Sequence, residues 1–283
     1  MMSPGIFART FARPTVEEVL AAAALPGLRC VQFNFACAGL PTLPDRCPEE
    51  ALLDRIRRAA ATHGLAIAAV SGTWNMAHPD PAERAAGLRC LPVLLEAARR
   101  LNAPVVTLCT GTRHPANMWI AHPDNKTPAA WADLTATLEP ALAAAAREGI
   151  TLGIEPETAN VVGSATQARR LLDEFRGAPL GIVLDPANLL RPGDAHQQQA
   201  ILDEAFHLLG DRLILAHAKE WDGQGHPDSL AVGEGHLDWA HYLGLLRRAG
   251  YEGPVILHGF SEAQAARSVA FLVDRMTRAA TDT

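Results

Sequence analysis

Eight short apolar segments recur along the chain, and a longer amphipathic segment follows each of them. The short segments are rich in Val, Ile and Leu and show little polar alternation, which is typical of strands buried on both faces. They cover residues 5–8, 28–33, 66–70, 104–108, 151–154, 180–184, 213–216 and 254–257. The pattern therefore predicts an α/β protein with a buried parallel sheet.

The segments between the strands are rich in alanine and repeat apolar residues with the period of a helix packed on a sheet. The first begins at Thr15, and Glu18 stands three residues later, at the spacing of a capping box. Three of the segments end at Gly64, Gly149 or Gly250, directly before the next strand, as helix stops do. The other helices are expected over residues 49–63, 81–101, 128–148, 166–175, 195–209, 237–249 and 262–278.

Eight strands alternating with eight helices, without a linker or low-complexity tract, predict a single (β/α)8 TIM barrel domain over residues 1–283. A length of 283 residues suits one such barrel. The competing architecture is a doubly wound open sheet. That architecture is disfavoured because no glycine-rich phosphate-binding sequence follows the first strand.

Composition excludes several classes of protein. The chain has 25 Lys and Arg against 31 Asp and Glu, a net charge of -6, whereas proteins that hold nucleic acid usually carry a basic surface. Its 5 cysteines form no Cys-x-x-Cys motif, so we expect reduced thiols in a cytoplasmic protein rather than a disulfide scaffold or a thiolate zinc site. No signal peptide and no apolar stretch of about 18 residues is recognisable, so a soluble protein without membrane partners is expected.

Polar residues at the carboxyl ends of barrel strands point into the mouth of the barrel, where active sites lie. The last four expected strands lead into Glu155, Asp185, His217 and His258, at intervals of about one strand–helix repeat. Four side chains on four consecutive strand ends should therefore face one point. Two carboxylates and two imidazoles suit a divalent metal ion, with Mn²⁺, Co²⁺, Fe²⁺, Ni²⁺, Zn²⁺ or Mg²⁺ as candidates. The alternative is that each is an ordinary capping or hydrogen-bonded rim residue.

Two further polar residues follow these strand ends. Lys219 lies two residues after His217 and is a candidate to donate to a substrate oxygen or to stabilise an oxyanion, or else to form a rim salt bridge. Glu157 lies two residues after Glu155 and is a candidate substrate contact, ligand partner or alternative base, or else a loop cap.

Substrate contacts are also expected from earlier loops. Near the third strand, Trp74, Asn75 and His78 are candidates for an apolar platform and polar contacts to a sugar ring, although Trp74 is equally suited to covering the top of the barrel. Arg113 lies in a long connection after the fourth strand and is a candidate to bind an anionic substituent, or else a solvated charge. A second long connection, residues 219–236, follows the seventh strand.

Five short motifs in a fixed order carry a resemblance to a known family. They are Gly-Ile-Glu-Pro-Glu (153–157), Leu-Asp-Pro-Ala-Asn (184–188), His-Ala-Lys-Glu (217–220), Gly-Glu-Gly-His-Leu-Asp-Trp (233–239) and Gly-Tyr-Glu-Gly-Pro-Val (250–255). On these motifs the chain resembles the xylose isomerase-like barrels, specifically the sugar phosphate isomerase/epimerase group, over nearly its whole length.

The resemblance implies that Glu155, Asp185 and His217 match three of the family's four metal ligands. The fourth, a second Glu, is replaced here by His258, and Asn188, a candidate substrate contact, stands where many members carry a histidine. Family epimerases use two Glu on opposite faces of the substrate to move a proton. Here His258 is either a neutral metal ligand or the acid/base partner of Glu155.

The function expected is therefore a metal-dependent isomerase or epimerase of a small sugar, keto-sugar or polyol, acting by proton abstraction next to a carbonyl. A metal-dependent lyase or dehydratase on a keto-sugar or inosose, and a non-catalytic sugar-binding barrel, remain alternatives. An apurinic-site endonuclease shares the barrel but needs more ligands and a basic groove, which the acidic composition disfavours. The partner expected is a small-molecule carbohydrate, and a homodimer is possible.

Overall fold

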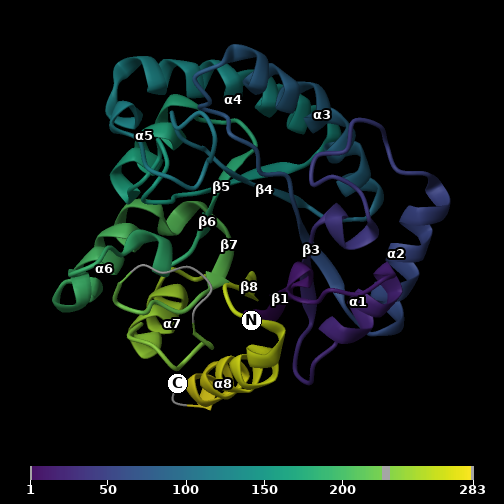
Figure 1. The fold of residues 1–283 in the computed structure, drawn as a ribbon. Coiled ribbons are helices and arrows are strands. Elements are labelled where there is room, and N and C mark those ends of the chain that lie inside the picture. The colour runs from purple at the N-terminus through teal and green to yellow at the C-terminus, as the bar shows by residue number, and fades with distance from the viewer. Residues whose placement is uncertain (1, 225–229, 282–283) are drawn as a thin grey trace.

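The computed structural model describes residues 2–224 and 230–281, and its centre is a closed ring of parallel strands (Figure 1). The strands are β1 (Ser3–Phe7), β2 (Cys30–Phe33), β3 (Ala66–Ser71), β4 (Val105–Cys109), β5 (Thr151–Glu155), β6 (Leu180–Leu184), β7 (Leu213–Ala218) and β8 (Pro254–Leu257). Each strand pairs with the next along the chain, and β8 pairs with β1 through the register Gly5 to Ile256. The predicted (β/α)8 barrel is confirmed.

An outer ring of helices covers the barrel (Figure 1). They are α1 (Val16–Ala23), α2 (Glu50–Thr62), α3 (Pro81–Arg100), α4 (Pro128–Glu148), α5 (Ala165–Glu174), α6 (Gln198–Leu209), α7 (Trp239–Arg248) and α8 (Glu262–Thr281). Helix α6 begins three residues later than expected because Asp194–His196 forms a separate 3-10 turn after Gly193, whose φ is 95°. Within residues 2–224 and 230–281, none of the helices combines the length and the apolarity needed to span a membrane.

The predicted capping box and a predicted glycine stop are both present. At the start of α1, Thr15 accepts a hydrogen bond from the backbone N–H of Glu18, and the Glu18 carboxylate accepts one from the backbone N–H of Thr15, which completes the capping box. Helix α4 ends at Gly149, whose φ of 67° lies in the left-handed region where glycine carries no steric penalty.

Two apolar layers hold the fold together. The larger one lies between the barrel and its helices, and the smaller one fills the barrel interior. The interior layer consists of Cys30, Ala68, Ala69, Val105, Val183, Leu215 and Ile256. Side chains two residues apart on a strand share a face, so the next interior positions toward the carboxyl ends lie directly above this layer. Those positions are polar: Gln32, Ser71, Thr107, Asp185, His217 and His258. The alternation of these six strands therefore places a polar layer directly above the apolar layer.

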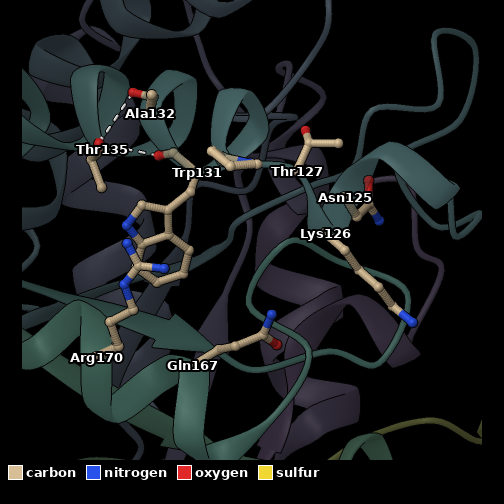
Figure 2. Close-up of a pocket in the computed structure, with 9 residues that line it drawn as sticks. Asn125, Lys126, Thr127, Trp131, Ala132, Thr135, Gln167 and Arg170 are labelled. Atoms are coloured by element: carbon tan, nitrogen blue, oxygen red, sulfur yellow. Dashed lines mark hydrogen bonds between the residues drawn. The ribbon is translucent and has the colours of Figure 1, made fainter.

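The outer surface carries a pocket of about 410 Å³ between the start of α4 and α5 (Figure 2). Its main aromatic surface is already occupied, because the Arg170 guanidinium stacks 3.9 Å from the centre of the Trp131 ring. Arg170 also pairs with Glu174 at 2.8 Å, and the Trp131 indole N–H donates to the same carboxylate. These contacts join α5 to α4 and serve the packing of the helices.

The barrel interior is narrow enough to require a glycine below Glu155. Gly153 lies on the same face of β5, and a Cβ added there would stand 2.7 Å from Val183 Cγ2. A side chain at this position must displace its neighbours. Close packing therefore accounts for the choice of residue at position 153.

We expect Gly153→Ala to lower the free energy of unfolding by about 1–3 kcal/mol, because it overpacks the interior layer. Gly244→Ala in α7 is the matched control, since its added Cβ meets only the flexible end of Arg248 at 3.3 Å. That change should raise the free energy of unfolding by about 0.5–1 kcal/mol, as alanine favours a helix. Urea unfolding measures both values. A Gly153→Ala protein as stable as the wild type would contradict the packing described.

Candidate metal centre

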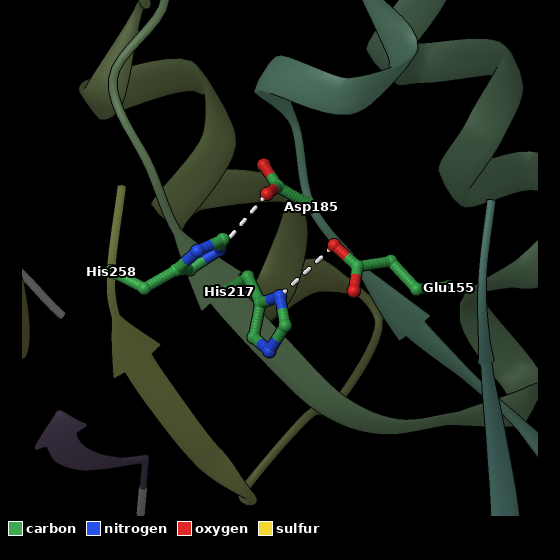
Figure 3. Close-up of side chains that lie close together, drawn as sticks. All are labelled: Glu155, Asp185, His217 and His258. Carbon is green, nitrogen blue, oxygen red and sulfur yellow. Dashed lines mark hydrogen bonds and ion pairs between the residues drawn. The ribbon is translucent and has the colours of Figure 1, made fainter. Parts of the chain in front are cut away.

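Two carboxylates and two imidazoles converge at the carboxyl end of the barrel (Figure 3). Glu155 is the last residue of β5, Asp185 follows β6, His217 lies in β7 and His258 follows β8. One ligand atom from each residue lies within 4.8 Å of all the others. The structure therefore brings together the four strand-end side chains singled out in the sequence.

Each carboxylate is paired with one imidazole. His217 Nδ1 lies 3.2 Å from Glu155 Oε1, and His258 Nε2 lies 3.0 Å from Asp185 Oδ2. The two imidazole rings are in edge contact, with 4.3 Å between their centroids. Glu155, Asp185 and His217 are buried and His258 is half-buried, so ligand atoms face one another with little competing water.

The pairing sets the charge of these groups. Burial raises the pKa of the Asp185 carboxyl, but the hydrogen bond and charge of His258 outweigh burial and hold that pKa well below its usual range. Burial likewise opposes ionisation of Glu155, yet His217 lowers the pKa of Glu155 overall. Burial and the neighbouring charge of His217 lower the pKa of His258. The imidazoles thus favour ionised carboxylates, which is the form that binds a metal ion, and each imidazole binds a metal ion in its neutral form.

The donor set fits a divalent transition metal. Carboxylate oxygen and imidazole nitrogen together suit Mn²⁺, Fe²⁺, Co²⁺, Ni²⁺ and Zn²⁺, whereas Ca²⁺ takes six to eight oxygen ligands. The nearest thiol does not change this assignment. Cys109 Sγ lies 3.9 Å from Glu155 Oε2, and burial together with the Glu155 charge raises the pKa of the Cys109 thiol well above its usual value. Cys109 lies beside the site and does not belong to the converging group of ligand atoms.

A second hydrogen-bonded chain reaches Glu155 from the cavity side. The Asn188 amide donates to Glu155 Oε1 at 2.7 Å, and the Lys219 ammonium donates to Asn188 Oδ1 at 2.9 Å. Asn188 therefore connects Lys219 to the carboxylate, and it orients Glu155 from the side opposite Cys109. A histidine at position 188 would offer a ring in place of this amide bridge.

Glu155, His217 and His258 line a cavity of about 830 Å³, and Asp185 contacts it only through its pairing with His258. Six residues predicted for the site line it: Glu155, Glu157, Asn188, His217, Lys219 and His258. Burial raises the pKa of the Glu157 carboxyl to about 7, against the opposing charge of Lys219. From the connection between β4 and α4, Met118 and Trp119 add apolar surface at the rim. A cavity of this size accommodates a small molecule.

Trp74 and Asn75 lie outside this cavity, in contrast to the expectation of a sugar platform. Trp74 is buried against α3, where a Cβ on Gly87 would stand 2.2 Å from the indole ring. Asn75 donates to the backbone carbonyl of Thr112 at 2.8 Å and accepts from its N–H at 2.9 Å. Asn75 thus joins the loops after β3 and β4, Trp74 packs on α3, and their contacts with a sugar stay predictions.

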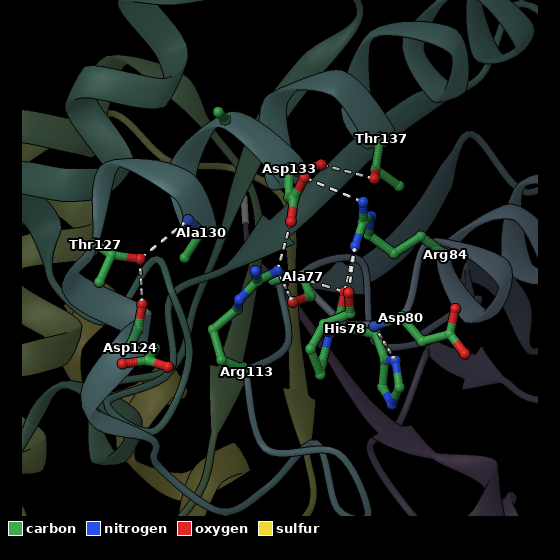
Figure 4. Close-up of polar contacts among 12 residues, drawn as sticks. Ala77, His78, Asp80, Arg84, Arg113, Asp124, Thr127, Ala130, Asp133 and Thr137 are labelled. Carbon is green, nitrogen blue, oxygen red and sulfur yellow. Dashed lines mark hydrogen bonds and ion pairs between the residues drawn. The ribbon is translucent and has the colours of Figure 1, made fainter.

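Arg113 and His78 do not line the cavity either. Figure 4 shows the polar contacts that they make instead. Arg113 pairs with Asp133 on α4 at 2.6 Å and donates to the Ala77 carbonyl at 3.1 Å. Arg84 binds the other oxygen of Asp133 at 3.1 Å. His78 Nε2 lies 2.9 Å from the Pro115 carbonyl. In this arrangement the Arg113 guanidinium holds the loops after β3 and β4 against α4, and its contact with an anionic substituent stays a prediction.

Sequence reasoning passed over the buried carboxylate of Glu220. It accepts hydrogen bonds from the backbone N–H groups of Trp221, Gly233 and Leu237 and from the indole of Trp239, at 2.7–3.0 Å. These four donors fix both ends of the long connection between β7 and α7, of which residues 225–229 lie outside the described residues. In the sequence, only its position as the last residue of the motif His-Ala-Lys-Glu (217–220) singled out Glu220.

We expect Arg113→Met to lower the free energy of unfolding by about 1–3 kcal/mol, because it leaves part of a half-buried charge network without its partner. It should leave metal binding unchanged. The control is Arg176→Met, which removes an arginine whose side chain is 80% exposed and should not alter stability. Chemical unfolding and metal titration test both variants. Loss of ligand binding by Arg113→Met at unchanged stability would instead support the predicted anion contact.

Comparison with known proteins gives the same fold. The model of the xylose isomerase-like TIM barrel family matches residues 19–275. No curated protein matches the chain. Among solved structures, an L-ribulose 3-epimerase is 19% identical with a TM-score of 0.75, covering 100% of this chain and 97% of that chain.

Two further solved structures are similar to the same extent. D-allulose 3-epimerase from Methylomonas sp., in complex with D-allulose, is 17% identical with a TM-score of 0.73 and 97% coverage of both chains. The 3-keto-D-glucoside 4-epimerase from E. coli is 18% identical with a TM-score of 0.71, covering 97% of this chain and 99% of that chain. At these identities the structures establish a shared fold, and the family match extends over most of the chain. The protein belongs to the xylose isomerase-like TIM barrel family.

Proposed function

We propose that the protein is a divalent-metal-dependent isomerase or epimerase that acts on a small keto-sugar by moving a proton next to the carbonyl. The observation that carries this proposal is the convergence of Glu155, Asp185, His217 and His258, three of which line the cavity. The similar structures named as ribulose, allulose and 3-keto-glucoside epimerases support a carbohydrate as substrate. A homodimer stays a prediction.

The proposed chemistry divides among the residues as follows. Glu155, Asp185, His217 and His258 would hold the metal ion. When bound, the ion supplies Lewis-acid stabilisation of negative charge that develops on the substrate oxygens. The Glu155 carboxylate faces the cavity and takes the proton from the carbon next to the carbonyl.

Lys219 is placed to donate to a substrate oxygen. Its ammonium lies 2.9 Å from Asn188 Oδ1, one hydrogen bond removed from Glu155. A positive charge held here stabilises an oxygen that becomes negative as the proton leaves carbon.

We expect Lys219→Met to lower kcat by about 10²–10³-fold, and Lys219→Arg to restore part of it, in steady-state assays with the active sugar. An unchanged kcat in Lys219→Met would remove this residue from the mechanism.

One observation favours a second candidate, a dehydratase that removes water from a keto-sugar. His258 occupies the place where the family has a second Glu, and an imidazole can protonate a leaving hydroxyl. In that reaction a C–H and a C–O bond break, the hydroxyl leaves as water and an unsaturated ketone forms. Absorbance of the unsaturated ketone distinguishes this product from an epimer.

Metal content tests the proposed site. Wild-type protein purified without metal-affinity columns should hold close to one equivalent of a divalent transition metal, and Asp185→Ala should lose it. Asp203→Ala is the matched control, since Asp203 forms a similar 2.9 Å pair with His241 on the surface. Elemental mass spectrometry measures the ratio. Wild-type protein that is metal-free and takes up none on dialysis against Mn²⁺, Co²⁺ or Zn²⁺ would overturn the proposal.

Proton exchange tests the reaction. Incubated in ²H₂O with ketopentoses, ketohexoses and 3-keto-glucosides, the metal-loaded protein should place deuterium on the carbon next to the carbonyl of its substrate. Glu155→Gln should lower the rate by about 10²–10⁴-fold, because it removes the proton acceptor. Nuclear magnetic resonance identifies the exchanged carbon and the product. Binding of these sugars without exchange would instead favour a sugar-binding barrel.

A further inference from the structure

Gln32 is a buried amide inside the barrel whose two ends are both hydrogen-bonded. It lies in β2, and its side-chain oxygen is 2.9 Å from Nε2 of His217 in β7. Its amide nitrogen donates to Ser71 Oγ at 2.9 Å and to Thr107 Oγ1 at 3.1 Å. All four side chains are buried. A hydrogen-bonded group from β2, β3 and β4 therefore meets a candidate metal ligand on β7.

The two nitrogens of His217 face different partners. Nδ1 points to Glu155 and the other ligand atoms, whereas Nε2 points to Gln32. A neutral imidazole has one N–H and one nitrogen lone pair, and only the nitrogen with the lone pair can bind a metal ion. Binding through Nδ1 therefore requires the proton on Nε2, and a buried N–H there requires an acceptor.

The Gln32 side chain supplies that acceptor when its oxygen faces His217. The reversed amide would present N–H groups to Nε2, would favour the proton on Nδ1 and would block that nitrogen as a ligand. The hydroxyls of Ser71 and Thr107 accept from the amide nitrogen in the observed orientation, so both amide protons are used. A buried amide costs free energy unless it is hydrogen-bonded, and here each of its atoms has a partner.

We propose that Gln32 is a positioning residue that keeps the proton of His217 on Nε2 and directs Nδ1 to the metal, with Ser71 and Thr107 fixing the orientation of the amide. This inference rests on the proposed metal site and extends it to the opposite half of the barrel. It assigns a role to β2, β3 and β4, none of which contributes a ligand to the cluster of Glu155, Asp185, His217 and His258.

Zinc affinity of the apo protein tests the proposal without any assay of activity. Gln32→Met keeps the length of the side chain and removes the acceptor, so we expect Zn²⁺ affinity to fall about 10–100-fold in competition with a chromophoric chelator. Gln32→Glu keeps an acceptor oxygen at the same place and should retain affinity close to that of the wild type. Gln264→Met is the control, because Gln264 accepts hydrogen bonds from Ser261 at the start of α8, away from the site.

The wild type itself provides a second readout. In Zn²⁺-loaded protein labelled with ¹⁵N-histidine, we expect the ring proton of His217 on Nε2 and the metal-bound shift on Nδ1. This measurement decides the question even if Gln32→Met fails to fold. A proton on Nδ1, or equal Zn²⁺ affinity in wild type and folded Gln32→Met, would overturn the role of Gln32 alone. Failure of the wild type to bind any Zn²⁺ would overturn the metal site as well.

Discussion

Closure of eight strands into one ring is the constraint on which the rest of the structure depends. Each strand turns alternate side chains inward, and closure forces these positions into layers. Val183 and Ile256 belong to the apolar layer, and two residues further along their strands lie Asp185 and His258. Residues separated by more than 100 positions in the sequence are thereby brought to one point, from the last residues of their strands or the first residues after them. The candidate metal centre is a direct result of strand alternation.

Charge balance then determines what this point can hold. Two buried carboxylates would be costly by themselves, and the described structure compensates each of them with an imidazole. Replacement of a second Glu by His258 leaves one negative charge fewer than the family pattern, so the ion would carry more net positive charge toward the substrate. Lys219, linked through Asn188, adds a further cation at the same side of the cavity. The proposed stabilisation of a developing oxyanion depends on these positive charges.

The sequence predicted the barrel and the four convergent residues because both depend on local periodicity and on position relative to a strand end. It did not predict the roles of loop residues, since these depend on distant partners. The Arg113 side chain is held by its ion pair with Asp133 on α4. The Trp74 ring packs on α3 at Gly87, where a larger residue would leave it no room. Gln32 was passed over because a single polar residue in an apolar strand has no local signal, and its partner lies 185 residues away in the sequence.

The central claim is that the ends of β5 to β8 form one metal site. The most direct test is anomalous X-ray diffraction from crystals of the wild-type protein soaked in Mn²⁺. We predict one strong anomalous peak within bonding distance of Glu155, Asp185, His217 and His258. Crystals that show these four side chains in the described arrangement and no anomalous peak between them, at saturating Mn²⁺ and again at saturating Zn²⁺, would contradict the account.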